Sequence, residues 1–496
     1  MIKELGYLVY GIYVVLTAWL LLNGILQLHL WRLAKKTGQK QPDDLSGLLP
    51  FVSIQAPVYN EKYVVEGLLV SLCNLDYPKE LFEILVLDDS TDETSILIDT
   101  KVATLAAAGF QIRTIRRRRR TGYKAGALQE SLSLCRGHFI AIFDADFRPQ
   151  PTFLTDLLPS FSDPNVGLVQ ARWGHLNREQ NFLTRVQAFL LDTYFSVEQA
   201  GRSNGGYFTN FCGTAGIWRK ECIVDAGGWD GTVLSEDLDL SYRAQLKEWK
   251  IVFREDKQIP AELPAVAWAF KMQQFRWTKG IMQVFRKNSG DVWKASLPFS
   301  KKLHAFFHLS GSFVFPCLLV NSLLSLPLLL FRYRFPEFVA LTNISAIGGL
   351  NLLFLTWIFS YGTKNGTSNA QFSRYYPIFL LVYMGLSVQN TVAVLQGMVG
   401  KPSAFLRTPK FHQNKAAVSA YLPQKWDVVN WLEVFFLLYF IAGILLSFYV
   451  GDYFFLLLFV MMATGLAILV FHAPWQRKKP LRILLPKISW RAFISG

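Results

Sequence analysis

Long apolar runs stand at both ends of this 496-residue chain and are missing from its middle. Residues 7–30 are almost wholly apolar, enough to cross a hydrocarbon core of about 30 Å. The run is too long for the apolar region of a signal peptide and lacks a small-residue cleavage site. The basic residues that follow it are Arg32, Lys35, Lys36 and Lys40. The positive-inside rule therefore places the N-terminus outside and the following residues in the cytosol.

Apolar runs return after residue 297, and the predicted membrane segments are 304–331, 335–359, 375–398, 428–450 and 453–471. If all of them crossed the bilayer, the basic segments 401–425 and 477–491 would lie outside, against the positive-inside rule. The most polar of them contains Gln389, Asn390 and Gln396. We expect that segment to lie in the interface, which leaves five crossings and makes both basic segments cytosolic. Six crossings with an external tail is the alternative.

The composition agrees with a membrane protein that carries a soluble insert. Hydrophobic residues make up 51% and charged residues 18% of the chain, against about 25% charged residues in average soluble domains. The net charge of +15 favours membrane lipids and a phosphate-bearing substrate. Zinc-ligand spacing and aromatic-basic RNA-binding motifs are absent, so no nucleic-acid partner is expected. The five cysteines show no CxxC pairing, which favours buried, reduced thiols in a reducing compartment.

Between residues 50 and 296 the pattern changes to short apolar runs that alternate with helical segments. The predicted strands are 51–58, 82–87, 111–115, 138–143 and 166–171, and the predicted helices include 64–74, 91–108 and 125–134. Strands that alternate with helices predict an α/β domain with a parallel sheet. Ligands of such sheets bind at the carboxyl ends of the strands. The residues directly after each strand are therefore the first candidates for a site.

Two acidic pairs follow predicted strands. Asp88 and Asp89 close the strand 82–87, and one of these carboxylates is a candidate for binding a nucleobase or ribose. Capping of the next helix explains them equally well. Asp144 and Asp146 close the strand 138–143 in a DxD pattern. Mg²⁺ and Mn²⁺ prefer such oxygen ligands, completed by phosphate oxygens, so this pair predicts a divalent metal with a diphosphate.

A third cluster, Ser235-Glu236-Asp237, begins an amphipathic helical run. Helix capping by Ser235 and favourable acids in the first turn are one interpretation. The catalytic interpretation makes Asp237 the general base that takes a proton from an acceptor hydroxyl, with Glu236 beside it. An inverting transfer needs one base and no protein nucleophile. The chain offers no convincing Ser-His-Asp or Cys-His arrangement as a competitor.

A fourth cluster, Gln273-Gln274-Phe275-Arg276-Trp277, comes just before the second apolar region. Arg276 suits a diphosphate and Trp277 suits stacking on a sugar ring. An interfacial amphipathic helix with a snorkelling arginine is the competing interpretation. Lys124 opens a predicted helix, where a phosphate is readily held. For the run Arg116–Arg120 we expect contact with lipid headgroups.

In this order and ahead of a membrane bundle, the clusters resemble the D, DxD, [TS]ED and QxxRW signature of the processive glycosyltransferases of family 2. The similarity is strongest to the cellulose-synthase-like A and C group of mannan and glucan synthases. It extends over about residues 50–290, in the segments VLDDSTDET (86–94), GYKAGAL (122–128), IAIFDADF (140–147), LVQARW (168–173), GTAGIWR (213–219), SEDLDL (235–240) and QQFRW (273–277).

The resemblance implies a GT-A fold inserted between transmembrane helices. By residue, it implies nucleotide-sugar contacts for Glu61, Asp88 or Asp89, Lys124, Asp144 and Arg276, metal ligation by Asp144 and Asp146, catalysis by Asp237 with Glu236, and acceptor contacts for Phe211, Cys212, Gly213, Gln273 and Trp277. The segment Phe405–Lys410 is similar to the gating loop of bacterial cellulose synthase, which adds Thr408 and Lys410 as nucleotide contacts. Arg407 stands where that loop usually has valine.

The expected organisation is an N-terminal transmembrane helix with linker (1–49), a cytosolic GT-A domain (50–296), a channel region (297–476) with a gating loop at 401–426, and a basic cytosolic tail (477–496). The expected function is inverting, metal-dependent, processive transfer of a hexose from UDP-glucose or GDP-mannose to a β-linked, β-1,4 polysaccharide, with export through the membrane helices. The expected location is a multi-pass protein of a cell inner membrane or a Golgi-type membrane.

Two alternatives remain from the sequence. A single-addition transferase that glycosylates a membrane lipid, similar to ceramide glucosyltransferase, would carry a similar signature. A transporter or receptor with a nonenzymatic nucleotide-binding insert would not need acids at positions 144, 146 and 237 together. The donor, the linkage and any protein partner stay open.

Overall fold

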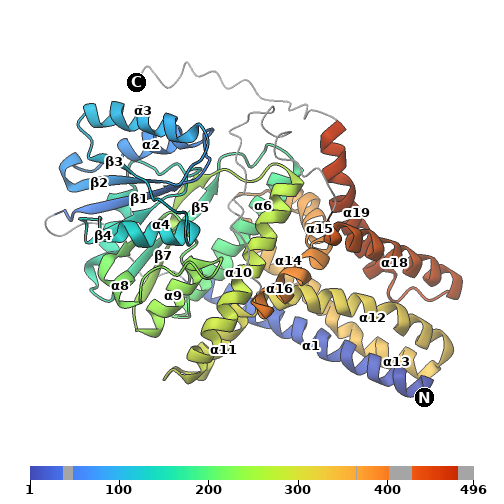
Figure 1. Ribbon diagram of the computed structural model, residues 1–496. Coiled ribbons are helices and arrows are strands. Elements are labelled where there is room, and N and C mark those ends of the chain that lie inside the picture. The colour runs from blue at the N-terminus through green and yellow to red at the C-terminus, as the bar shows by residue number, and fades with distance from the viewer. Residues whose placement is uncertain (37–48, 365, 401–426, 479–496) are drawn as a thin grey trace.

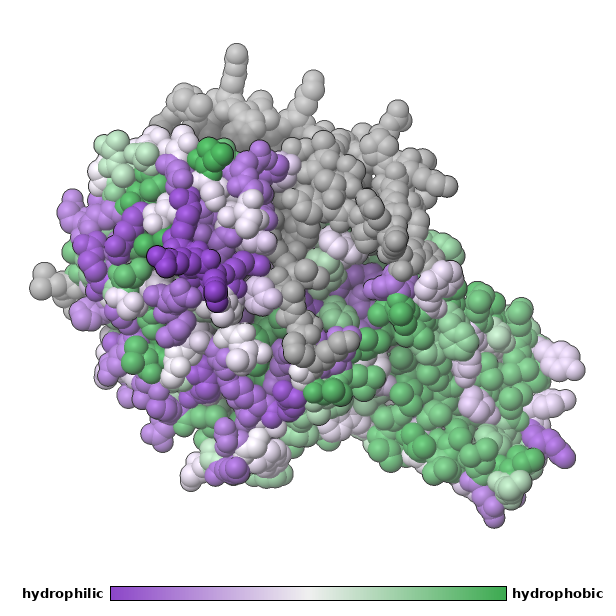
Figure 2. Space-filling view, in the orientation of Figure 1, coloured by the Kyte–Doolittle hydropathy of each residue, from purple (hydrophilic) through white to green (hydrophobic). Residues whose placement is uncertain are grey.

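Apolar helices flank an α/β domain in the computed structural model, which describes residues 1–36, 49–364, 366–400 and 427–478. Hydrophobic residues cover the part of the surface formed by α1 (Ile2–Ala34), α12 (Val314–Arg334), α13 (Pro336–Ser345) and α18 (Val428–Val450) (Figures 1 and 2). Hydrophilic residues gather instead over the sheet domain (Figure 2). This division confirms the predicted architecture of an α/β domain between apolar helices.

Four helices of the described chain are long and apolar enough to cross a membrane: residues Ile2–Ala34, Gly311–Arg334, Pro336–Gly362 and Val428–Val450. The predicted segment 375–398 forms two helices, α15 (Asn369–Gly385) and α16 (Ser387–Val399), bent by 48°, which would make a fifth span if the pair crossed together. The last predicted crossing is a shorter apolar stretch, Leu456–Phe471. The interfacial position of 375–398 and the direction of the crossings stay predictions.

The sheet has seven strands in the order β3-β2-β1-β4-β6-β5-β7. Their bounds are β1 Val52–Val58, β2 Phe82–Asp88, β3 Ile112–Ile115, β4 Phe139–Ile142, β5 Val166–His175, β6 Gly216–Arg219 and β7 Lys250–Ala261. Strands β1 to β4 pair in parallel, and so do β5 and β7. The short β6 runs antiparallel to both β4 and β5, so the sheet is mixed and the all-parallel prediction is wrong at this strand.

The remaining described elements are α2 (Val65–Cys73), α3 (Thr94–Ala107), α4 (Tyr123–Leu132), α5 (Phe153–Leu157), α6 (Phe182–Thr193), a π-helix (Tyr194–Gln199), α7 (Ala200–Asn204), α8 (Lys220–Asp225), α9 (Glu236–Leu246), α10 (Ala267–Lys294), α11 (Phe299–Leu309), α14 (Leu350–Gly362), α19 (Leu456–Lys478) and short 3₁₀ turns at Lys79–Leu81, Leu158–Ser162, Gly311–Phe313 and Ala346–Gly349.

Period-two alternation in the central strands builds a core on both faces of the sheet. In β2, Ile84 and Val86 belong to the core on one face, with α2 and α5, while Leu85 and Leu87 belong to the core on the other, with α4. All four side chains are buried. Because successive strand residues point to opposite faces, an unbroken apolar run is what a sheet covered on both sides requires.

Helix α10 connects the sheet domain to the membrane helices and carries the predicted Gln273–Trp277 cluster (Figure 1). It starts at Ala267, six residues after the end of β7 at Ala261. Its thirteen buried residues include both apolar and polar side chains, because it packs against the sheet domain on one side and the helical bundle on the other. This position makes α10 the structural link between the two parts.

Candidate active site

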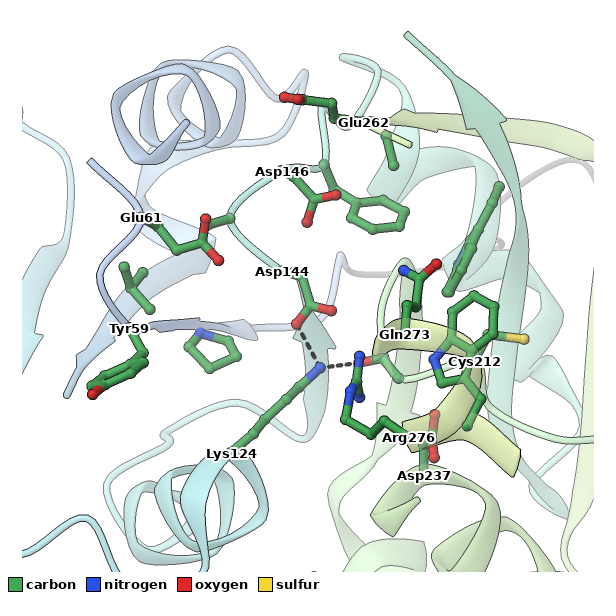
Figure 3. A pocket seen from close by; sticks show the side chains of 18 of the residues that line it. Tyr59, Glu61, Lys124, Asp144, Asp146, Cys212, Asp237, Glu262, Gln273 and Arg276 are labelled. Carbon is green, nitrogen blue, oxygen red and sulfur yellow. Dashed lines mark hydrogen bonds and ion pairs between the residues drawn. The ribbon is translucent and has the colours of Figure 1, made fainter. Parts of the chain in front are cut away.

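A single pocket at the carboxyl ends of β1, β2 and β4 contains most of the side chains that the sequence predicted (Figure 3). The predicted residues that line it are Glu61, Asp89, Lys124, Asp144, Asp146, Cys212, Gly213, Glu236, Asp237, Gln273, Arg276 and Trp277. Figure 3 shows Glu61, Asp144 and Asp146 on one side of the Lys124 ammonium, with Gln273, Arg276 and Asp237 on the other. Residues separated by more than 200 positions in the chain thus converge on one site.

Lys124 is held at the centre of this pocket by two contacts. Its Nζ donates to Asp144 Oδ1 at 2.5 Å and to the carbonyl oxygen of Gly213 at 2.9 Å. The Lys124 side chain is 14% exposed and the Asp144 side chain is 36% exposed. Burial lowers the pKa of Lys124, but the charges of Asp144, Glu236 and Asp237 outweigh burial and raise it overall. The pocket therefore keeps a positive charge at its centre.

The acidic side of the pocket could hold a divalent metal if phosphate oxygens of a substrate complete its coordination. Asp144 and Asp146 offer hard oxygen donors from the turn after β4, and both line the pocket. Among the residues that the structure describes, no three His, Cys, Asp or Glu side chains form a metal-binding group. Mg²⁺ and Mn²⁺ take about six oxygen ligands and are commonly bound by one or two carboxylates plus substrate phosphates. Asp144 and Asp146, with the Lys124 ammonium beside them as a candidate phosphate ligand, fit that pattern.

Asp237 lies in the first turn of α9, with its carboxylate in the pocket. Its Oδ1 accepts a hydrogen bond from the backbone N–H of Leu238 at 2.8 Å, as expected for an acid at a helix N-terminus. Ser235 occupies the N-cap position, but its side chain makes no capping hydrogen bond. It packs instead against α10, where a Cβ built on Gly280 would lie 2.2 Å from its Oγ. Ser235 therefore packs the start of α9 closely against α10.

Burial makes the two acids of this motif unusually basic. Burial and the charge of Asp237 raise the pKa of Glu236 to about 7, against the lowering effect of Lys124 and Arg276. Burial also raises the pKa of Asp237, although the Leu238 N–H and the charges of Lys124 and Arg276 oppose the shift. Since the two carboxylates repel each other, the pair keeps one proton up to a higher pH than an ordinary carboxylic acid does. A raised pKa is what a general base needs at neutral pH.

Unusual backbone angles cluster around the pocket. Tyr123, which precedes Lys124, has φ 50°, Ala215 has φ 56° and Asn60 has φ 56°. Gly213 has φ 83°, and a Cβ there would lie 3.0 Å from Asp237 Oδ2. Left-handed angles at non-glycine residues persist only where the surroundings hold them, and they are common at active sites. The turns that carry Lys124 and Gly213 are therefore held in place by the fold.

The structure places Asp88 and Phe211, two of the predicted site residues, outside the pocket lining. Asp88 is outside the pocket, and its carboxylate accepts hydrogen bonds from the Ser95 hydroxyl and from Arg116 Nε, each at 2.8 Å. It supports the turn after β2, which leaves Asp89 as the acid of this pair that faces the pocket. Phe211 is fully buried between Trp218 and Trp229. Its role is in the core beneath the segment that carries Gly213.

Three of the five arginines Arg116–Arg120, for which we expected lipid contact, have partners within the sheet domain. Arg116 pairs with Asp88 and Asp99, and Arg117 pairs with Asp89 at 2.5 Å. Arg120 lines the pocket with its guanidinium 3.4 Å from the ring centroid of Tyr59. Most of these arginines therefore make contacts within the sheet domain, because the run follows β3 and lies beside acidic residues such as Asp88 and Asp89. Thr408 and Lys410 lie outside the described residues.

The pocket also contains residues for which the sequence predicted no role in the site, among them Tyr59, Arg120, His175 and Glu262. Tyr59 follows β1 directly and Glu262 follows β7, so the rule that ligands bind after strand ends would have found Tyr59, and Glu262 once β7 was recognised. His175 ends β5 and contacts Asp192 at 3.1 Å. Burial lowers the pKa of His175 despite the raising effect of Asp192, so this ring tends toward the neutral form.

Comparisons with known proteins agree with this geometry. The model of glycosyl transferase family 2 matches residues 53–223, and that of glycosyl transferase family group 2 matches residues 139–361. The chain is 33% identical over 428 residues to probable glucomannan 4-beta-mannosyltransferase 3 of Oryza sativa subsp. japonica, covering 83% of this chain and 76% of the rice protein. It is 39% identical over 305 residues to glucomannan 4-beta-mannosyltransferase 1 of Cyamopsis tetragonoloba, covering 58% of each.

Among solved structures, the chain is similar to the mannosyltransferase PcManGT from Pyrobaculum calidifontis in complex with GDP-Man and Mn²⁺. The TM-score is 0.54 at 18% sequence identity, and the similarity covers 79% of this chain and all of that one. At this level of identity the comparison supports the fold.

Proposed function

Because the chain belongs to glycosyl transferase family 2, we propose that it transfers mannose from GDP-mannose to the growing end of a β-1,4-linked polysaccharide, with inversion at the anomeric carbon. The curated relatives are named as 4-beta-mannosyltransferases, which favours mannose over the glucose of UDP-glucose. The matched part covers 58% of the Cyamopsis protein, so substrate and product are proposed here from the site as well as from the relatives.

The observation that carries the proposal is the convergence of Lys124, Asp144, Asp146 and Asp237 on one pocket. Asp237 takes the proton from the attacking acceptor hydroxyl while the acceptor oxygen bonds to the anomeric carbon. The bond between that carbon and the diphosphate oxygen breaks, and the electron pair leaves with the diphosphate. A single displacement of this kind needs the base and the leaving group on opposite sides of the sugar.

The positively charged side chains of the pocket bind the diphosphate and stabilise it as it leaves. Lys124, inserted between Asp144 and the Gly213 carbonyl, binds the diphosphate, and Arg276 balances the charge that develops on it. Asp144 and Asp146 would hold Mg²⁺ or Mn²⁺, which stabilises the departing diphosphate when bound. Arg120 and Tyr59 flank the nucleoside end of the pocket, beside Asp89. Gln273, Trp277 and Cys212 border the acceptor end.

Processive transfer and export through the apolar helices extend this proposal. Four to five candidate spans connected to the site through α10 support a polymer that leaves across a membrane. A cytosolic position of the sheet domain follows from the basic residues after the first span.

The full-length protein in membranes, incubated with radiolabelled GDP-mannose and Mn²⁺, tests the proposal directly. We expect a polymer that an endo-β-1,4-mannanase digests, no product after EDTA treatment, and no product from Asp237→Asn, which still binds GDP. A parallel incubation with UDP-glucose tests the donor. Label that appears in a lipid fraction with a single sugar, or a product made equally well by Asp237→Asn, would contradict the proposed polymerase mechanism.

A further inference from the structure

A buried ion pair joins the helix that carries Arg276 to a membrane helix. Lys271 Nζ, on α10, donates to both carboxylate oxygens of Glu433, on α18, each at 2.7 Å. The Lys271 side chain is 11% exposed and the Glu433 side chain is fully buried. Glu433 lies within the candidate span Val428–Val450. A carboxylate in such a segment is costly, and its usual justification is a specific partner with a functional role.

The ion pair between Lys271 and Glu433 is better suited to fixing the relative position of α10 and α18 than to stabilising the fold. Desolvating two charges offsets most of the attraction between them, so a buried ion pair contributes little to stability compared with well-packed apolar residues. It does fix geometry, since the bidentate contact is lost if either helix slides or rotates. From Lys271 to Arg276 is five residues, or about 7.5 Å along a helix. The ion pair is therefore about one and a half turns from the side chains that face the pocket.

Helix α16 holds the same stretch of α10. Gln389 Nε2 donates to the backbone carbonyl of Lys271 at 2.8 Å. Two turns further along, Lys279 Nζ donates to Gln396 Oε1 at 3.1 Å. A Cβ built on Gly397 would lie 2.8 Å from the carbonyl oxygen of Lys279, so the two helix backbones come close there. The bundle thus contacts α10 on both sides of Gln273, Arg276 and Trp277.

The other side of α10 touches the segment that carries the proposed base. Gln283 Oε1 accepts a hydrogen bond from the backbone N–H of Leu234 at 2.9 Å. Gly280 faces Ser235 so closely that a Cβ there would lie 2.2 Å from its Oγ. Asp237 follows two residues later. A shift of α10 would therefore move the start of α9 as well as the side chains of α10.

We propose that Lys271 and Glu433 are positioning residues that fix α10 against the membrane helices and thereby align Arg276 and Trp277 with Asp237. This inference rests on the proposed function, because alignment matters only if sugar is transferred in this pocket. Lys271 and Glu433 are not among the residues that line the pocket, so their effect on the reaction is indirect. Misplacement of catalytic groups by about 1 Å is enough to lower a rate by about a hundredfold.

The kinetic test compares full-length Glu433→Gln, Lys271→Met and the conservative Lys271→Arg. We expect the loss of kcat for transfer from GDP-mannose in the first two to exceed their loss of GDP affinity by on the order of tenfold. Lys271→Arg keeps the charge and a bidentate partner, and is expected to retain most of the rate. The matched control is Asp452→Asn, which breaks the Arg332–Asp452 ion pair, with side chains 7% and 20% exposed, elsewhere in the bundle.

A second measurement does not depend on activity. Spin labels at Asp291→Cys on α10 and Val428→Cys on α18, both exposed positions, report the distance between the helices. The partly exposed Cys212 and Cys317 are replaced beforehand. We expect one narrow distance distribution in the otherwise unchanged protein and in Asp452→Asn, and a shifted or broadened one in Glu433→Gln.

The outcomes separate the two proposals. An unchanged distance distribution in Glu433→Gln overturns the positioning role, whether or not the protein transfers mannose. So does a loss of kcat in Asp452→Asn equal to that in Glu433→Gln, since the effect would then be general to the bundle. If the unchanged protein transfers sugar from neither donor, the proposed function is wrong. The spin-label result still decides whether Lys271 and Glu433 fix the position of α10.

Discussion

Gly213 and Asp237 are so close that a Cβ built on the glycine would lie 3.0 Å from Oδ2 of the aspartate. Gly213 also has φ 83°, and its carbonyl oxygen accepts a hydrogen bond from Lys124 at 2.9 Å. One glycine therefore borders both the proposed base and the proposed diphosphate-binding lysine. Because of this close approach, a side chain in the segment before β6 would have to displace the Asp237 carboxylate at the start of α9.

The first prediction follows from this contact. Gly213→Ala is expected to lower kcat on the order of tenfold or more, because the added methyl group pushes the Asp237 carboxylate away from its position. The left-handed backbone adds a destabilisation of about 1–2 kcal/mol. Gly109→Ala is the matched control, since Gly109 has φ 86° and no atom of the described chain within 4 Å of its Cβ position. Equal activity of the two variants would contradict the prediction.

The second prediction concerns stability as a function of pH. The pKa of Glu236 is raised from 4.5 to about 7, so between these values the folded protein keeps a proton that the unfolded chain releases. The free energy of unfolding therefore falls as the pH rises through this range. Glu236→Gln removes this contribution, and its melting temperature should fall less between a pH near 4.5 and a pH above 7.

Thermal unfolding without nucleotide or metal, in the same detergent, measures this effect. Glu221→Gln, at an exposed position of the same domain, is the control and should follow the unchanged protein. Identical pH dependence of the melting temperature in Glu236→Gln and the unchanged protein would show that Glu236 ionises normally.

The third prediction concerns the diphosphate. Lys124→Met should weaken GDP binding roughly ten- to a hundredfold, because a hydrogen bond between charged groups contributes about 1.5–3 kcal/mol. Isothermal titration calorimetry with GDP and Mn²⁺ measures the change. Lys250→Met, which removes a lysine that is 61% exposed and pairs with Asp163, should bind GDP as the unchanged protein does. Unaltered GDP affinity in Lys124→Met would exclude Lys124 from the diphosphate site.

The fourth prediction tests the nucleoside end of the pocket. Arg120→Ala should weaken GDP binding several-fold, since the proposed nucleoside end of the pocket loses a guanidinium that can stack on the base, and a contact of this kind contributes about 0.5–2 kcal/mol. The affinity for pyrophosphate should stay the same. Arg119→Ala, an exposed neighbour, serves as the control in the same binding assay. A parallel loss of pyrophosphate affinity in Arg120→Ala would place Arg120 at the diphosphate instead.

Several features could not have been predicted locally. β6 spans only Gly216–Arg219 in a glycine-rich stretch, and β7 carries charged side chains, Pro260 and a shift in register, so neither shows the apolar run of a buried strand. Asp88 and Asp89 are equivalent in sequence, but only Asp89 lines the pocket, while the carboxylate of Asp88 is directed to Ser95 and Arg116. From the sequence alone, Arg116–Arg120 resemble a surface patch, because their acidic partners are distant in the chain.

The apolar segments at both ends, the α/β character of the middle and the residue types needed for the proposed chemistry can all be predicted from the sequence. These properties depend on hydrophobic periodicity and on motifs a few residues long, which are local. The tertiary structure alone decided which of those residues share a pocket, how far burial raises the pKa values of Glu236 and Asp237, and that Lys271 meets Glu433, 162 positions away. Contacts and desolvation of this kind arise only when distant segments pack together, and therefore leave no periodic pattern in the chain.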